Sequence, residues 1–205
     1  MGSRAVFERA FQAYGLPGRI RSDNGVPFAT QALARLSPLS VWWVRLGILP
    51  DLIEPASPQQ NGRHERMHRT LKHETTRPPC ASRAAQQRRF NRWRQEFNTL
   101  RPHEALNDAT PASVYVPSPR RYPARLPALE YPGHYEARRV SNNGGIRWHC
   151  TWVNVSQTLG GEVIGLVEID DGEWDVYFGP LRLGRFHERT MLIEDAHGRQ
   201  HRRPY

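Results

Sequence analysis

The stretch SPQQNGRHERMHRTLK, residues 57–72, decides how the rest of this chain is interpreted. It opens with turn-forming residues, and the pattern after them predicts a helix that begins near Arg63. Within that helix, His64, Glu65 and His68 spell H-E-x-x-H, two imidazoles one helical turn apart with a carboxylate beside the first. Glu65 is therefore either the general base of a zinc hydrolase or a residue with another function.

The surroundings of the motif disfavour zinc hydrolysis. Arg63, Arg66 and Arg69 flank it, and extra cations beside Zn²⁺ are unfavourable. A third ligand is required, yet neither an H-x-x-G-x-x-H extension nor an acidic helix follows. The motif also begins its helix, with no apolar segment before it. A zinc metallohydrolase is therefore kept only as the less favoured alternative.

The composition limits the class of protein. The 205 residues suffice for one domain or a domain and a half, and 38% of them are hydrophobic, which argues against disorder. No apolar run approaches the ~20 residues that span a bilayer, and no secretory signal follows Met1, so no membrane partner is expected. Cys80 and Cys150 are far apart and outside any C-x-x-C motif, which favours reduced thiols and a cytoplasmic location.

The positive charge is concentrated in one segment. The formal net charge is +9, and residues 60–105 contain eleven Lys or Arg against four acids. Residues 133–205 contain nine basic and ten acidic residues. This distribution predicts a polyanionic partner such as nucleic acid, and the alternative is a solvated basic surface.

Hydrophobic periodicity divides the chain into parts. We expect, in order, a helix over 4–14, a short strand over 19–23, a helical segment ending near Gly47, a short strand over 49–56, a helix from Arg63 and a helix over 83–100. The last helix has Phe90, Trp93, Phe97 and Leu100 at i, i+3, i+7 and i+10, which predicts one buried stripe.

The composition changes after residue 106. Residues 107–132 are Pro-rich without strong periodicity and are expected to be a linker. From residue 133, short alternating strands separated by Gly- and Asp-rich turns predict a small all-β barrel of the SH3-like kind, over 133–205.

Four motifs, taken in order, resemble the DDE transposases and retroviral-type integrases. They are RSDNG (21–25), PQQNG followed by Glu65, RTLK (69–72) and NTLRPHEALNDATPASVY (98–115). In that family an Asp at a strand end and a Glu at the start of a later helix are metal ligands. The resemblance thus implies that Asp23 and Glu65 are catalytic and metal-binding, although they lie further apart than is usual.

The same resemblance implies a fold and an activity. It makes residues 1–106 a partial integrase catalytic core with an α/β ribonuclease H-like fold, lacking its first strands and followed by a helical arm. The β module then matches the small C-terminal domain of bacterial insertion-sequence transposases. The implied activity is DNA integration and recombination by metal-dependent phosphodiester strand transfer. The implied partners are double-stranded DNA (transposon ends and target) and, when intact, further copies of the protein, in the bacterial cytoplasm at the nucleoid.

The chemistry of the residues agrees with this resemblance. Phosphodiester transfer uses hard divalent cations, and Mg²⁺ (or Mn²⁺) prefers carboxylate oxygens such as those of Asp and Glu. The helix dipole favours an anion at Glu65, in the first helical turn. We expect the following residues to lie along DNA, while Met67 and Leu71 face the core: Asn24, Gly25, Arg66, His68, Arg69 and Lys72.

Structural alternatives exist for both acids. Asp23 can open an Asx turn, and Glu65 can form a surface pair with Arg69. The family site also needs a third acid on an opening strand, and residues 1–22 contain only Glu8, in a predicted helix. We therefore expect the C-terminal part of a transposase, catalytically incomplete by itself. The alternative is a non-catalytic DNA-binding remnant.

Overall fold

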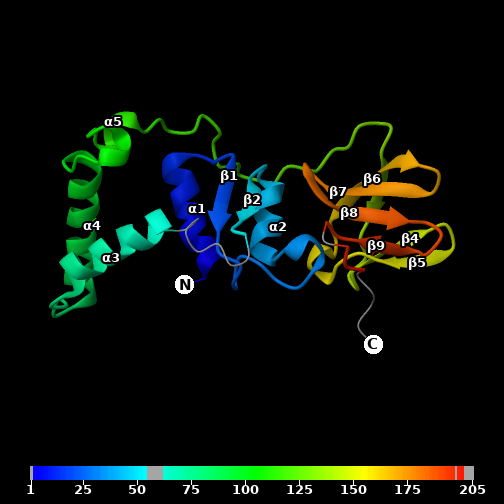
Figure 1. Cartoon of the computed structure of the whole chain (residues 1–205), viewed down its shortest axis with the longest axis horizontal. Helices are drawn as coiled ribbons and strands as arrows, with labels where there is room; N and C mark the ends of the chain where they lie inside the picture. The colour runs from blue at the N-terminus through cyan, green and yellow to red at the C-terminus, as the bar shows by residue number, and fades with distance from the viewer. Residues whose placement is uncertain (1, 55–61, 197, 201–205) are drawn as a thin grey trace. The chain divides into compact units, whose positions relative to one another are not determined.

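The computed structural model describes residues 2–54, 62–196 and 198–200, so the PQQNG loop expected before Glu65 lies mostly outside the described residues. The chain divides into two compact units (Figure 1). The larger unit contains residues 1–53 and 118–205, and the arm unit contains residues 54–117. Each unit is described by itself.

The first part of the larger unit is a β-α-β arrangement preceded by a helix. After α1 (Ser3–Tyr14), strands β1 (Arg19–Ser22) and β2 (Leu49–Leu52) pair in parallel, with α2 (Pro38–Arg45) between them in the chain. The expected helical segment is shorter than predicted, because Ser37 caps α2 by accepting the Ser40 N–H at 3.1 Å. Between β1 and α2 the chain forms the short 3₁₀ turn η1 (Leu33–Arg35).

The second part of the larger unit is all β. A five-stranded antiparallel sheet has the order β3-β6-β7-β8-β9, and β4 and β5 form a separate antiparallel hairpin. The fold is thus mixed, with helices and sheets, and the SH3-like barrel stays a prediction. The strands are β3 (Glu136–Arg139), β4 (Gly145–Trp148), β5 (Thr151–Asn154), β6 (Val163–Asp170), β7 (Glu173–Phe178), β8 (Leu181–His187) and β9 (Leu192–Glu194), with the 3₁₀ turn η4 (Gln157–Leu159) after β5.

The two parts of the larger unit meet in one hydrophobic cluster, and a second cluster lies within the first part, formed by Phe11, Leu16, Leu39, Trp42, Trp43, Leu46 and Ile48. Leu33, Leu36, Val41 and Val44 belong to the same buried cluster as the inward-facing residues of the β sheet. At the edge of that cluster, Arg45 on α2 forms an ion pair of 2.7 Å with Glu162. The β module therefore buries apolar surface against the α/β part, and the division into domains at 1–106, 107–132 and 133–205 stays a prediction.

The segment 118–132, which is part of the linker predicted over 107–132, is anchored to the larger unit by side-chain hydrogen bonds. The Arg120 guanidinium donates to the carbonyls of Leu46 at 2.6 Å and Gly47 at 3.0 Å. Further along, the Tyr131 hydroxyl donates to the Val163 carbonyl and accepts the Gly179 N–H, both at 2.9 Å. Prolines remove backbone donors, but the neighbouring arginine and tyrosine side chains supply donors in their place.

The arm unit is a pair of helices followed by two short helical turns. Helices α3 (Gly62–Thr76) and α4 (Arg83–Thr99) pack together, and η3 (Glu104–Leu106) and α5 (Pro111–Val114) follow. Phe90 and Phe97 are half-buried and Trp93 is buried, as the stripe predicts. Leu100 was wrongly placed in the stripe: it caps the end of α4 and is 72% exposed. Among the described residues, the structure has no helix whose length and apolar character would let it cross a membrane.

The contact between segment 118–132 and the sheet can be tested at Gly165 on β6. A Cβ there would overlap the ring of Tyr131, which its hydroxyl holds in place, and lie 2.8 Å from Tyr135 Cδ1. Gly165→Ala is expected to lower the free energy of unfolding by about 2 kcal/mol, measured by thermal or urea denaturation. Gly133→Ala, where a Cβ meets nothing within 4 Å, is the matched control. Equal stability of the two variants would contradict the described packing.

Candidate functional site

Asp23 lies directly after β1, at the carboxyl end of the parallel pair. Its side chain is exposed, and its Oδ1 accepts the Gly25 N–H at 2.9 Å, which is the geometry of an Asx turn. The structural alternative for Asp23 is therefore present in the fold. It does not exclude a second role, because a carboxylate has further lone pairs on its other oxygen.

The two residues after Asp23 shape this turn. The Asn24 amide Nδ2 donates to the Ile53 carbonyl at 2.9 Å and so links the end of β1 to the end of β2. Its Oδ1 is buried and has no hydrogen-bond partner within the described part of the chain. A Cβ at Gly25 would lie 3.3 Å from Asp23 Oδ1, so a side chain there would crowd the carboxylate. Contact of Asn24 and Gly25 with DNA stays a prediction.

Glu65 is exposed in the first turn of α3. His68, Arg69 and Lys72 follow at i+3, i+4 and i+7 and are exposed on the same side, and Arg66 beside them is exposed as well. Met67 and Leu71 are half-buried on the opposite side, as expected. Helix α3 therefore presents a carboxylate within a basic surface.

The two histidines of the H-E-x-x-H motif contact one another. His64 Nε2 lies 2.9 Å from His68 Nε2, and the pKa of His68 is lowered by partial burial, by His64 and by Lys72. Within residues 2–54, 62–196 and 198–200, no group of three or more His, Cys, Asp or Glu side chains is placed to hold a metal ion. The third ligand that a zinc site requires is therefore not found among these residues.

Asp23 and Glu65 belong to different units of the chain. Asp23 follows strand β1 of the larger unit, and Glu65 lies in the first turn of α3, the first helix of the arm unit. Because each unit is described by itself, the joint metal site of the two carboxylates stays a prediction.

Sequence analysis missed the interaction that holds the arm unit together. The Glu74 carboxylate on α3 accepts hydrogen bonds from both terminal nitrogens of Arg101 and, at 2.8 Å, from Trp93 Nε1. The Arg101 guanidinium also lies over the Trp93 ring, 5.9 Å from its centroid. The hydrogen bonds of Arg101 are the largest cause of the lowered pKa of Glu74. The signal for this interaction in the sequence was Glu74 itself, an acid within a basic segment.

A second arginine of the arm is also structural. Arg89 on α4 donates to the Glu74 carbonyl near the end of α3 at 2.9 Å and to the Pro78 carbonyl in the loop that follows α3 at 3.1 Å. Gln86 bridges the same loop, donating to the Thr75 carbonyl at 2.8 Å and accepting the Cys80 N–H at 3.0 Å. Arg89 and Arg101 therefore satisfy internal acceptors, and the charge count alone could not distinguish them from surface cations.

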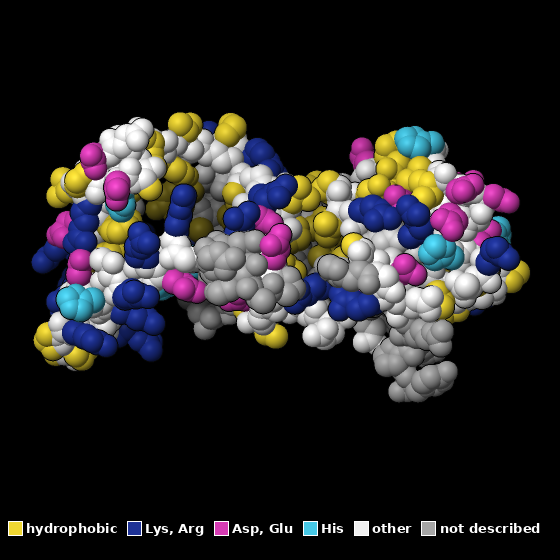
Figure 2. Space-filling model, viewed as in Figure 1, with side chains coloured by type: hydrophobic (Ala, Val, Ile, Leu, Met, Phe, Trp, Pro, Cys, Tyr) yellow, Lys and Arg dark blue, Asp and Glu magenta, His cyan; other side chains and the backbone are white. Residues whose placement is uncertain are grey.

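The remaining nine basic residues of residues 60–105 are exposed. Figure 2 shows Lys and Arg side chains gathered over this part of the molecule. They form a surface suited to a polyanion, and they are Arg63, Arg66, Arg69, Lys72, Arg77, Arg83, Arg88, Arg92 and Arg94.

Comparisons with known proteins agree with the sequence motifs. Residues 46–111 match the family model described as integrase core domain. The chain is 30% identical over 108 residues to the uncharacterized 31.7 kDa protein of insertion element IS407 from Burkholderia multivorans, which covers 52% of this chain and 37% of that protein. It is 29% identical over 129 residues to the uncharacterized 39.2 kDa protein of insertion element IS476 from Xanthomonas euvesicatoria, covering 62% and 31% respectively.

The chain thus spans roughly a third of the length of these two relatives. The match confirms, for residues 46–111, the resemblance to the catalytic region of DDE transposases and integrases. Glu65, Glu74 and Arg101 lie inside the matched stretch, and Asp23 lies outside it.

The role of Glu74 gives a pH prediction. Because pairing with Arg101 lowers the pKa of folded Glu74 below its unfolded value, its contribution is present above the unfolded pKa and is lost as the pH falls through the folded pKa. Glu74→Gln should destabilise the arm by about 1 kcal/mol at neutral pH, a modest value because the pair is partly exposed. Its effect should shrink in acid.

Hydrogen exchange of the α3 and α4 amides measures this change. Glu104→Gln, which alters an exposed acid of the same unit, is the control and should leave the exchange rates unchanged. Equal protection of α3 and α4 in wild type and Glu74→Gln at neutral pH would contradict a stabilising role for this carboxylate.

Proposed function

We propose, from the match of residues 46–111 to the family model described as integrase core domain, that this chain is the C-terminal part of a transposase or integrase acting in DNA integration and recombination. The observation that carries the proposal is Glu65, an exposed carboxylate in the first turn of α3, inside the matched stretch and beside exposed basic residues. A carboxylate and cations on one helix face suit a site that handles phosphodiesters.

The donor set suits a hard divalent cation. Asp23 and Glu65 both offer exposed carboxylate oxygens, which Mg²⁺ or Mn²⁺ prefers. When bound, such an ion would polarise the phosphate and lower the pKa of the attacking hydroxyl. The Asx turn orients Asp23 by holding one of its oxygens on the Gly25 N–H.

The basic residues of α3 would position the substrate. Arg66, Arg69 and Lys72 can each neutralise a phosphate of duplex DNA, and such contacts fix the protein on the backbone without reading bases. The half-buried side of α3, held by Glu74, keeps these side chains directed to solvent. Transposon ends and target DNA are the substrates that this role implies.

A second candidate function is DNA binding without catalysis. The exposed basic surface of the arm favours it independently of the carboxylates, because that surface would bind DNA whether or not a metal site is complete. The two candidate functions share DNA as their partner, and only the first includes catalysis.

The DNA partner is tested by binding isotherms of the full chain at several salt concentrations. Affinity for duplex DNA should fall steeply with salt because condensed counterions are released. Arg66→Ala and Lys72→Ala should each lower affinity for all duplex sequences alike and reduce the salt slope by about 1. Arg121→Ala, an exposed arginine of the larger unit, is the charge-matched control and should bind like wild type. Binding that does not change with salt would refute an electrostatic DNA interface.

Catalysis is tested by strand-joining assays with Mg²⁺ or Mn²⁺. Two carboxylates are too few to hold two cations, so the 205-residue chain should neither cut nor join DNA by itself. Fusion to the upstream segment of a longer relative, with its strand-borne Asp, should restore joining, and Asp23→Asn or Glu65→Gln should abolish it again. Joining by the unfused chain would show that the proposed incompleteness is wrong.

If the fused protein binds DNA but never joins it, the non-catalytic function is favoured. Elemental analysis separates the zinc alternative. One Zn²⁺ per chain, lost in His64→Ala and His68→Ala, would favour a zinc metallohydrolase over strand transfer.

A further inference from the structure

The exposed face of α4 carries uncharged polar residues to which the proposed function assigns no role. Ten of the seventeen residues of α4 are exposed, and among them there is no acid and no large apolar residue. The structure describes the whole of this helix. The exposed residues are Arg83, Ala84, Gln87, Arg88, Asn91, Arg92, Arg94, Gln95, Asn98 and Thr99.

These residues have a definite arrangement along the helix. Gln87, Asn91 and Gln95 follow one another at i, i+4 and i+8, and Asn98 continues the same line. Gln87 Nε2 donates to Asn91 Oδ1 at 3.1 Å, which places the first two amides side by side. We call these four residues the amide line.

Arginines lie on both sides of the amide line. Around the helix axis, Arg92 lies about 100° beyond Asn91 on one flank of the amide line, and Arg94 lies on the other flank, since residues two apart are about 200° apart around a helix. The side of α4 opposite the amide line carries Arg89, Phe90 and Trp93; Arg89 donates to the Glu74 carbonyl of α3, and the Trp93 ring stacks on Phe97. The amide line is therefore central on the solvent side, with a cation at each margin.

This arrangement matches the chemistry of a DNA major groove. Asn and Gln amides donate and accept together, as the N6 and N7 edge of adenine requires, and Arg pairs with guanine or with phosphate. An α-helix is about 10–12 Å wide with its side chains, and the major groove is about 12 Å wide. Flanking arginines would then meet the phosphates that border the groove on both sides.

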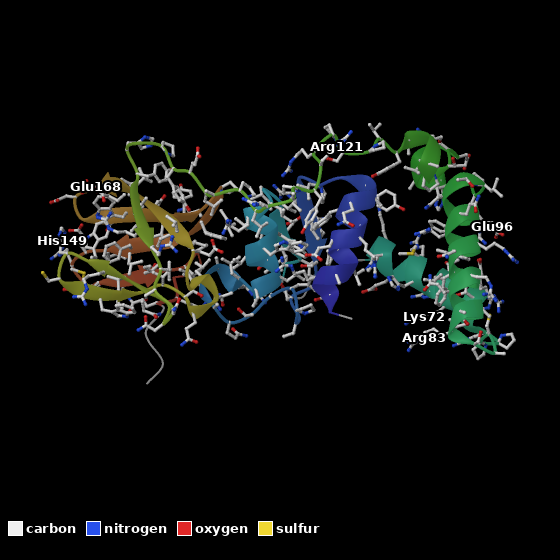
Figure 3. The ribbon with its side chains drawn as sticks, turned by 180° about the vertical axis from the view of Figure 1, so that it is seen from behind. Lys72, Arg83, Glu96, Arg121, His149 and Glu168 are labelled. Carbon is white, nitrogen blue, oxygen red and sulfur yellow. The ribbon has the colours of Figure 1, made fainter. Side chains whose placement is uncertain are left out.

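Other partners fit this face less well. A coiled-coil partner or a membrane surface would need an apolar stripe, and the exposed side of α4 has none in its fully described length. An acidic protein surface would attract the arginines but would leave the amide line without a role. The single acid of α4, Glu96 (labelled in Figure 3), is half-buried. The pKa of the Arg101 guanidinium is raised mainly by its hydrogen bond with Glu74, and the charge of Glu96 adds to this rise.

We propose that the exposed face of α4 enters the major groove of duplex DNA, where the amide line reads base edges and Arg92 and Arg94 contact phosphates. The inference rests on the proposed function for its partner class, DNA. It deepens that function by assigning sequence reading to α4, separate from the phosphate contacts of α3.

The test is selection of duplexes from a random library by the full chain, followed by affinity measurements on selected and scrambled duplexes. The wild type should enrich a motif containing adenines. The variant with Asn91→Ala and Gln95→Ala should lose about ten-fold or more of the ratio between selected and scrambled affinity. Its affinity for scrambled duplexes and its salt slope should stay at wild-type values. Circular dichroism checks that α4 remains helical.

The control with Arg66→Ala and Lys72→Ala separates the two proposals. It should weaken binding to both duplexes equally and keep the ratio between them. If the amide variant keeps the wild-type ratio, or if the wild type enriches no motif, reading by α4 is overturned while binding through α3 stands. If the wild type binds no duplex, both proposals fail together.

Discussion

Both units depend on hydrogen-bond donors for backbone carbonyl groups that have no backbone donor, and arginine side chains supply these donors. The chain contains 17 prolines, none of which can donate a backbone hydrogen bond. In the larger unit, Arg45 donates to the Pro127 carbonyl at 2.8 Å and Arg120 donates to the Pro17 carbonyl at 3.1 Å. In the arm unit, Arg89 donates to Pro78 at 3.1 Å. A planar guanidinium serves two acceptors at once, which a lysine ammonium does less well.

This constraint changes the meaning of the basic composition. A high arginine content predicts a polyanion partner, yet part of it is used inside the fold. Arg101 and Arg89 hold α3 against α4, and the outward-facing cations owe their positions to this packing. Structural and DNA-facing arginines therefore support one another, because a helix that is not held cannot present its charged side in a fixed direction.

Local patterns predicted much of the fold, and distant contacts were not predicted. The helices α1, α3 and α4 and the alternation of short strands after residue 133 follow from periodicity and turn residues, which act over a few positions. Contacts that link distant segments leave no such pattern. Glu74 and Arg101 are 27 residues apart, and Arg120 bonds to carbonyls more than 70 residues away. The same holds for the candidate site: the exposure of Glu65 follows from its helix position, whereas its relation to Asp23 depends on two units.

The division of the chain has a consequence for its biosynthesis. The arm interrupts the larger unit, whose hydrophobic core joins Val41 and Val44 to Ile164 and Phe178. As the ribosome extends the chain from its N-terminus, Phe11, Trp42 and Trp43 can already pack together within residues 1–53, whereas Val41 and Val44 emerge long before their β-strand partners. The contacts of the arm are closer in sequence and are complete once residue 117 has emerged. Helices α3 and α4 can thus assemble co-translationally before the β strands that complete the cluster around Val41 and Val44 have been synthesised.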